Sequence, residues 1–250
     1  GGNSIFAVTL WIIARLAQVE GTGIFPLMIG GILWNLAITF GLLGILDGHM
    51  TSHELLEMPA EVWPSLFISY SIIATIILVI HRSRKVKGTI APQWFLLASL
   101  LWFPFLFLIA WDGLEINPAR GTVQSVISMW FGQNLIWLWL TPVALGAAYY
   151  VIPAILGRQI DKYYLAIFGF WCIAGLAPWS VVHHLEGGPV PMWIPAIGTV
   201  MSIAMIFPIA VASTNFHSTA FQDIARVWNS LPLRFVIFGT LSYTISSYIG

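Results

Sequence analysis

The sequence predicts an all-α fold, a polytopic transmembrane helical bundle, from its composition and from the length of its apolar runs. Hydrophobic residues make up 58% of the 250 residues and charged residues only 8%, whereas about a quarter of a soluble domain is charged. Mean hydropathy is +0.87. Apolar runs long enough to cross a bilayer, about 20 residues, recur along the chain. We therefore expect the lipid bilayer to be the main partner of this chain, and the formal net charge of zero favours no nucleic acid.

Eight helical segments follow from these runs. In chain order they are residues 2–17, 27–47, 63–81, 93–111, 123–151, 163–184, 192–211 and 233–249. No charged residue lies in the middle of any segment, which argues against an ion-coupled transporter, since these proteins carry charges within the bilayer. Pro104, Pro142 and Pro208 lie inside segments and are expected to kink them, which neighbouring helices can accommodate.

The first segment begins without a charged flank or signal peptide, and the last stops where the sequence stops. We therefore expect residues 1–250 to be a single transmembrane domain cut from a longer polytopic protein.

The charges between the segments predict the orientation of the chain. Nine of the ten basic residues fall in or beside alternate connections: Arg15, Arg82, Arg84, Lys85, Lys87, Arg158, Lys162, Arg226 and Arg234. The other connections hold seven of the ten acids and only Arg120 among the bases. Because positive residues stay in the cytoplasm, the basic connections are predicted to be cytoplasmic. A slip of the segments by one span would scatter the basic residues.

A histidine pair ends the sixth segment, in the stretch SVVHHLEGGPVPMW (residues 180–193). The predicted orientation places His183 and His184 at the outer end of their helix. Neutral imidazoles suit zinc, copper or iron. Neighbouring helix positions point about 100° apart, so one ion between the two rings requires an irregular helix end or a third ligand from another helix. Interfacial side chains without a metal are the alternative. The single Cys172 allows no intrachain disulfide.

The stretch WFGQNLIWLWLTPVALGAAYYVIPAILGR (residues 130–158), followed by the helix that ends in HHL, resembles subunit I of the cbb3-type cytochrome c oxidases, a branch of the haem-copper oxidase superfamily. In that family the matching helix has a tryptophan-rich start, a Gly-His-Asn and a Tyr-Tyr before Val-Pro, and the next helix ends in His-His-Leu. GGN (residues 1–3) matches the second helix and LRF (residues 233–235) the ninth. The resemblance thus covers the whole chain, as helices two to nine of a subunit of the 12-helix type.

The resemblance implies an oxidoreductase, a membrane subunit of a respiratory complex that transfers electrons to O2 and takes up protons. It implies haem, with ligands outside this segment, and a copper or non-haem iron ion at His183 and His184. The implied partners are other respiratory subunits, a c-type cytochrome as electron donor and a small gas, O2 or NO. The implied location is the bacterial inner membrane.

Two positions depart from the family pattern. Gln133 stands where the family has the third copper-binding histidine, and an amide carbonyl is a harder and weaker copper ligand. Ala177 stands where the family has the tyrosine that supplies an electron and a proton for O–O cleavage. Nitric oxide reductases of the superfamily need no tyrosine but add a glutamate on the helix of the first histidine, and no acid follows Gln133 here before Asp161. Two alternatives stay open: a relative that handles nitric oxide, and a non-catalytic membrane scaffold with a decayed metal site. Glu186 is interpreted as a solvated loop acid.

Two further patterns are candidates for sites. His49 and His53 are spaced i, i+4 in DGHMTSHELLEMP, which predicts a short solvated loop helix with Thr51 and Glu54 as a capping box; with Glu57 it is also a candidate outer metal site. A second pattern places four hydroxyls on one face of the last segment, at Thr240, Tyr243, Thr244 and Ser247. They are predicted to bond between helices, with a water-filled proton path as the alternative.

Overall fold

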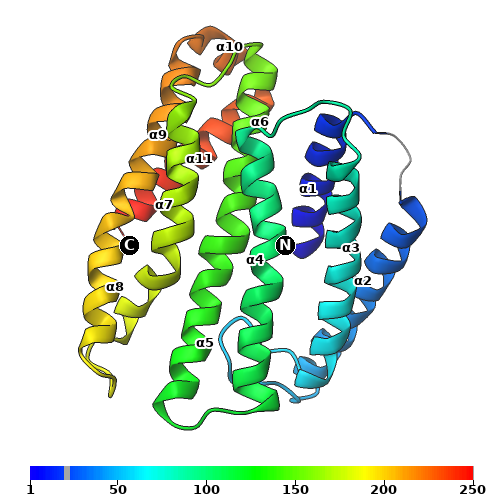
Figure 1. The fold of residues 1–250 in the computed structure, drawn as a ribbon, viewed down its shortest axis with the longest axis vertical. Coiled ribbons are helices and arrows are strands. Elements are labelled where there is room, and N and C mark those ends of the chain that lie inside the picture. Colours follow the sequence, from blue (N-terminus) through cyan, green and yellow to red (C-terminus); the bar gives the residue numbers. More distant parts are fainter. Residues whose placement is uncertain (20–22, 250) are drawn as a thin grey trace. The chain divides into compact units, whose positions relative to one another are not determined.

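The structure is a computed structural model that describes residues 1–19 and 23–249, and all regular elements in these ranges are helices (Figure 1). The helices are α1 (Gly2–Ala17), α2 (Ile24–Leu46), η1 (Ala60–Val62), α3 (Trp63–Arg82), α4 (Ala91–Trp111), η2 (Asp112–Ile116), α5 (Thr122–Asn134), η3 (Leu135–Leu140), α6 (Thr141–Leu156), α7 (Tyr164–Ser180), η4 (Val181–Leu185), α8 (Trp193–Ala204), α9 (Ile206–Phe221), α10 (Ile224–Asn229) and α11 (Leu231–Ile249). The predicted helical class is therefore confirmed.

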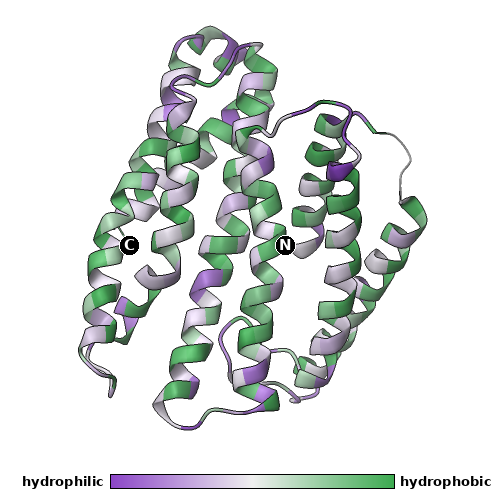
Figure 2. Cartoon of the chain, in the orientation of Figure 1, coloured by the Kyte–Doolittle hydropathy of each residue, from purple (hydrophilic) through white to green (hydrophobic). Residues whose placement is uncertain are grey.

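Six helical stretches of the described residues are long and apolar enough to cross a membrane: Ile24–Leu46, Ala60–Arg82, Ala91–Ile116, Thr122–Leu156, Tyr164–Leu185 and Trp193–Phe221. Helix α1 is also apolar but has only 16 residues, and α11 is not among the six. Hydrophobic residues run along the helices, and hydrophilic residues gather in the connections (Figure 2). The membrane class is confirmed, but the expected eight crossings are not.

Two predicted segments that contain proline differ from the structure in their bounds or in their continuity. The segment 192–211 is two helices, α8 and α9, with a break at Met205, and α9 continues to Phe221. Pro208 lacks the N–H that would bond to the carbonyl four residues earlier, which accounts for the break. The segment 123–151 begins at Thr122 and ends at Leu156, and the π-helical η3 ends at Leu140, two residues before Pro142. Helix α4, by contrast, continues through Pro104.

The chain divides into two compact units, with one boundary in the connection between α3 and α4 and the other two inside α4 and η3. Residues 1–88 and 97–139 form the first unit, and residues 89–96 with those from 140 onward form the second. The expectation of a single transmembrane domain stays a prediction.

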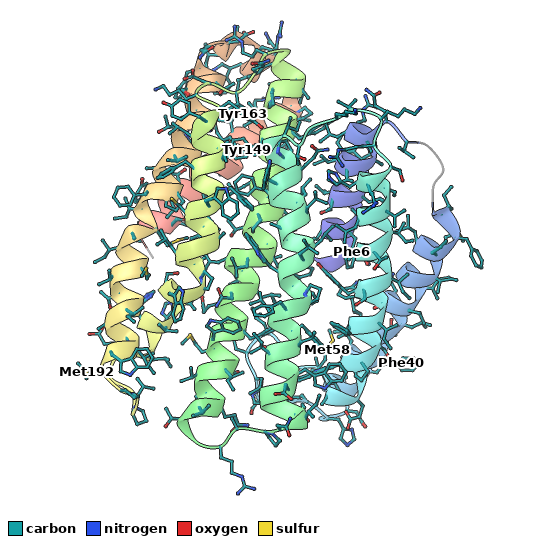
Figure 3. The ribbon with its side chains drawn as sticks, viewed as in Figure 1. Phe6, Phe40, Met58, Tyr149, Tyr163 and Met192 are labelled. Atoms are coloured by element: carbon teal, nitrogen blue, oxygen red, sulfur yellow. The ribbon has the colours of Figure 1, made fainter. Side chains whose placement is uncertain are left out.

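Aromatic side chains hold the first unit together around Tyr70 of α3. The ring centroids of Tyr70 and Phe103 lie 4.2 Å apart, and those of Tyr70 and Phe6 lie 5.3 Å apart. The Tyr70 hydroxyl donates to the Leu100 carbonyl at 3.3 Å. Such aromatic pairs contribute about 1 kcal/mol each. Phe6 faces this core, whereas Phe40 of α2 points outward and is 61% exposed, as expected for a side chain that faces lipid (Figure 3).

The second unit has its own aromatic core around Tyr149 of α6 (Figure 3). The ring of Tyr149 lies 4.5 Å from that of Phe216 on α9 and 5.4 Å from that of Phe95 at the start of α4. Tyr163 lies directly before α7, and its hydroxyl accepts a hydrogen bond from the Ala91 amide at 2.7 Å. These contacts tie α6, α9 and the first turns of α4 into the unit whose helix α7 leads to the histidine pair.

Candidate metal site

The histidine pair lies on an irregular helix end. Helix α7 ends at Ser180, and the chain continues as the 3₁₀ turn η4, which carries His183 and His184. The two ring centroids are 4.1 Å apart and the ring planes are inclined by 34°. Neighbouring side chains of a regular α-helix point about 100° apart, yet these two rings lie in contact at this irregular end. The irregular end that a shared ion requires is thus present.

His183 is held by the carbonyl of Ser180. The Nδ1 atom of His183 bonds to the Ser180 oxygen, and a carbonyl oxygen can only accept. A neutral His183 therefore carries its proton on Nδ1 and leaves the lone pair of Nε2 available for a metal. His183 is half-buried and His184 is exposed. Metal-binding histidines commonly have their other ring nitrogen fixed by a carbonyl in this way.

Gly198 of α8 lets that helix approach the backbone of η4. A Cβ atom at residue 198 would lie 2.2 Å from the His183 nitrogen and 2.7 Å from the Val182 carbonyl carbon. Both are backbone atoms, so no side-chain rotation relieves the clash. Gly198 therefore positions the turn that carries the pair. The sequence alone did not identify Gly198, because a glycine in an apolar helix does not indicate which residues it contacts.

Gln133 lies in the first unit, on α5, and is half-buried. Its neighbour Asn134 is fully buried and donates from Nδ2 to the Trp130 carbonyl at 2.9 Å. The Oδ1 atom of Asn134 has no hydrogen-bond partner among the described residues. The turn therefore presents one half-buried amide and one buried, unsatisfied acceptor.

A carboxylate lies against the same turn of α5, and sequence reasoning missed it. The Glu54 carboxyl carbon would be 3.4 Å from a Cβ atom at Gly132, the residue before Gln133. The Glu54 amide donates to the Ser128 hydroxyl of α5 at 3.3 Å. The sequence shows no acid on the helix of Gln133. Glu54 instead comes from the connection that follows α2. No local pattern in the sequence pairs these segments.

The histidine pair belongs to the second unit and Gln133 to the first. The site that combines His183, His184 and Gln133 therefore stays a prediction. Among the described residues, no group of three or more His, Cys, Asp or Glu side chains is placed to hold a metal ion. The two imidazoles fit two ligand positions of a copper or non-haem iron ion, so a third ligand of another type, such as an amide, is needed.

Ala177 and Glu186 lie on either side of the pair. Ala177 is fully buried, and its carbonyl accepts a bond from the Ser180 hydroxyl at 3.0 Å. Glu186 is exposed in the connection after η4, and its amide donates to the His183 carbonyl at 3.0 Å. The interpretation of Glu186 as a loop acid agrees with its exposure.

The predicted helix around His49 and His53 is wrong. The Thr51 amide donates to the Glu57 carbonyl at 3.1 Å, and the Thr51 hydroxyl donates to the Leu56 carbonyl at 2.6 Å. These bonds close a compact loop and replace the helical pattern and its capping box. His53 is buried, with 8% exposed, while His49 is exposed and contacts Asp47 at 3.2 Å. The two rings thus have different environments, and the predicted shared helix face does not form.

Two hydroxyls of the predicted stripe on α11 bond within their own helix. Thr240 donates to the Ile237 carbonyl at 3.0 Å, and Thr244 to the Thr240 carbonyl at 2.8 Å. For these two residues the predicted bonds between helices are wrong, since a backbone carbonyl one turn away is the nearer acceptor. A cavity of about 370 Å³ lies between α6 and α11, with Thr240 and Tyr243 among its lining residues. The water-filled path stays a prediction.

Comparison with known proteins agrees with the resemblance found in the sequence. The family model described as Cytochrome C and Quinol oxidase polypeptide I matches residues 1–250. The cbb3-type cytochrome c oxidase subunit CcoN1 of Stutzerimonas stutzeri is 25% identical, over 100% of this chain and 54% of its own length. The cytochrome c oxidase subunit 1 of Rhodobacter capsulatus is 25% identical, over 100% of this chain and 49% of its own.

A further relative is the bacteroid cytochrome c oxidase subunit 1 homolog of Bradyrhizobium diazoefficiens, 25% identical over 100% of this chain and 47% of its own length. The chain spans about half the length of the curated relatives it matches.

Proposed function

The chain belongs to the cytochrome c and quinol oxidase polypeptide I family, and we propose from this premise that it is part of the membrane subunit of a respiratory haem-copper oxidase. Its reaction would be the transfer of electrons to O2 with uptake of protons. The observation that carries the proposal is the histidine pair, held on η4 with His183 Nδ1 bonded to a carbonyl. Two adjacent imidazoles, one with its tautomer fixed by a carbonyl, suit a redox metal.

In this proposal His183 and His184 bind copper or non-haem iron, and Gln133 supplies the third ligand from α5. When bound, this ion provides redox chemistry beside a haem, whose ligands the resemblance places outside residues 1–250. The protein's own contribution is to hold both imidazoles in place. Gly198 does this by seating α8 on the backbone of η4, and Ser180 by fixing the His183 ring.

The proposed partners follow from the family. They are other subunits of a respiratory complex, a c-type cytochrome that donates electrons, and O2. The proposed location is a bacterial inner membrane, with the basic connections in the cytoplasm and the histidine pair towards the outer side. The sign of the charge in alternate connections supports this orientation.

Glu54 favours a second candidate, a relative that reduces nitric oxide. Its carboxyl group lies against Gly132, next to Gln133, and carboxylates are suitable ligands for non-haem iron. The buried Ala177, at the position of the family's tyrosine, also agrees with a reaction that needs no tyrosine. Oxygen and nitric oxide consumption by the same preparation, each measured with an electrode, distinguishes the two candidates, and Glu54→Gln should lower only nitric oxide consumption.

The test of the metal site compares metal content in the purified full-length protein. We expect one copper or iron ion beyond the iron of haem, and we expect the double variant His183→Ala, His184→Ala to lose it while retaining haem. His49→Ala is the matched control, because His49 is an exposed histidine that pairs with Asp47. A second metal that persists in the double variant would refute the site. Haem without any second metal in the unaltered protein would favour the scaffold alternative.

A further inference from the structure

One face of α1 is exposed along its whole length and changes from apolar to basic. Val8, Trp11, Arg15 and Gln18 follow one another at helical spacing and are all exposed. Val8 and Trp11 are apolar, and Arg15 lies in the last turn of the helix. A phospholipid has the same order of chemistry, with an apolar chain followed by a charged headgroup.

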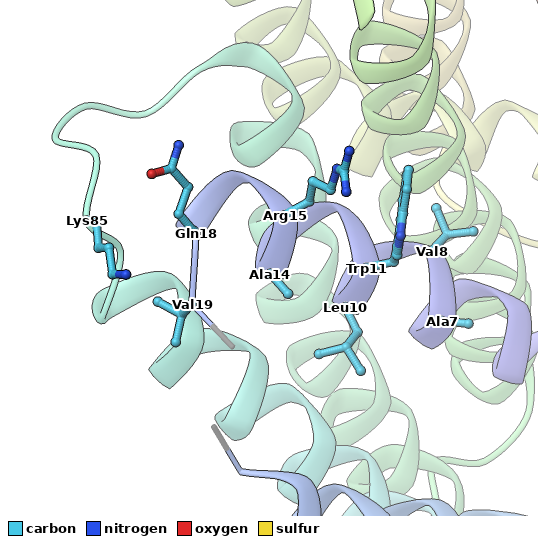
Figure 4. Close-up of a pocket in the computed structure, with 9 residues that line it drawn as sticks. All are labelled: Ala7, Val8, Leu10, Trp11, Ala14, Arg15, Gln18, Val19 and Lys85. Atoms are coloured by element: carbon cyan, nitrogen blue, oxygen red, sulfur yellow. The ribbon is translucent and has the colours of Figure 1, made fainter. Parts of the chain in front are cut away.

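An open pocket of about 1380 Å³ follows this face of α1. Figure 4 shows Val8, Leu10 and Trp11 along the helix and Arg15 and Lys85 at its C-terminal end. Lys85 comes from the connection after α3, and its backbone amide donates to the Ala17 carbonyl at 3.1 Å. This bond anchors the basic connection at the end of α1, so that two cations from separate segments flank one end of an apolar surface.

Neither cation has a carboxylate partner within the described ranges. Among residues 1–19 and 23–249, ion pairs form at His49 with Asp47 and at Arg226 with Asp223, and neither involves Arg15 or Lys85. Arg15 and Lys85 are both exposed. Basic side chains at the end of a membrane helix attract anionic lipid headgroups, and tryptophan prefers the same interfacial depth.

We propose that this pocket binds an anionic phospholipid, with its phosphate near Arg15 and Lys85 and an acyl chain along Val8 and Trp11. The arrangement favours a phospholipid over an acidic peptide, because the cations lie at one end of an apolar wall about two helical turns long. The site is independent of the histidine pair, which lies in the other unit.

The test uses purified full-length protein in detergent with phospholipids that carry brominated acyl chains, which quench nearby tryptophan. The signal of Trp11 is the difference between the unaltered protein and Trp11→Phe. Phosphatidylglycerol, which is anionic, should quench this signal at a lower concentration than phosphatidylcholine. Arg15→Gln and Lys85→Gln should each raise the phosphatidylglycerol concentration required by about fivefold, the factor expected for one cation near an anionic lipid.

Lys87→Gln is the matched control, since Lys87 is an exposed cation of the same connection that does not line the pocket. It removes the same charge and should leave the quenching curve unchanged. An equal response to both lipids would overturn the proposal in favour of ordinary boundary lipid. No quenching of Trp11 would overturn it in favour of a protein segment that covers the face.

Glu20, close to Arg15 in the sequence, lies outside the described residues. Repeating the measurements in a Glu20→Gln background tests whether Glu20 is the partner of Arg15. If the phosphate is the partner of Arg15, the effect of Arg15→Gln persists in that background. If the effect vanishes, Arg15 serves to pair with Glu20, and the lipid site is refuted.

Discussion

The two halves of the predicted metal site differ in how firmly the fold holds them. In the second unit, His183 and His184 lie on a 3₁₀ turn that is fixed by the Ser180 carbonyl and by the approach of α8 at Gly198. In the first unit, Gln133 lies on a helix beside the fully buried Asn134, whose Oδ1 is unsatisfied within the described part of the chain. Backbone contacts therefore position the histidine half, whereas the amide half depends on a half-buried side chain of α5.

This contrast bears on the departure from the family pattern that the sequence indicates at residue 133. The backbone contacts that position the pair lie in the second unit, and Gln133 lies in the first. A backbone contact such as that at Gly198 tolerates no substitution, whereas a half-buried position on a helix accepts several side chains.

The largest effect is expected for Gly198→Ala. The new Cβ atom would meet backbone atoms of Val182 and His183 at less than 3 Å, so η4 or α8 must move, at a cost of about 3 kcal/mol. The midpoint of thermal unfolding should fall, and the second metal should be lost while haem is retained. Gly175→Ala is the control, because a Cβ atom there meets nothing within 4 Å. Equal effects of the two substitutions would contradict the positioning role of Gly198.

A smaller effect is expected for Ala177→Tyr, which restores the family's residue. Ala177 is fully buried, so the ring overfills the site and costs about 2 kcal/mol. We expect a lower midpoint of thermal unfolding and no gain in oxygen consumption. Gly175→Tyr, at an exposed position of the same helix, should change the midpoint little. A fully stable Ala177→Tyr variant would show that the histidine half is less rigid than its contacts indicate.

The smallest effect on stability is expected for Gln133→His, in the amide half. Because Gln133 is half-buried on a helix, the substitution should change the free energy of unfolding by less than about 1 kcal/mol. Imidazole is the better copper ligand, so copper affinity should rise by at least about tenfold, or ~1.4 kcal/mol. Competition with a copper chelator measures this. Unchanged affinity would mean that residue 133 does not face the histidine pair.

Sequence reasoning predicted the helices well where a long apolar run decides the structure, and poorly where contacts between segments decide it. The segment 163–184 corresponds to α7 and η4 with a difference of one residue at each end. The stretch from Thr51 to Glu57 was predicted to be helical but closes as a loop, because Thr51 bonds across to Leu56 and Glu57. Helical periodicity in a short polar stretch does not outweigh such bonds.

By itself, the sequence determined that this protein is helical and enters a membrane, because apolar runs of this length can satisfy their backbone groups in lipid only as helices. It also determined where the histidine pair lies along the chain. Only the tertiary structure decided that α8 seats on η4 through Gly198, that Glu54 lies against the turn of Gln133, and that Lys85 joins Arg15 at the end of α1. These contacts join residues far apart in the sequence, and their geometry depends on how whole helices and connections meet, which no local pattern encodes.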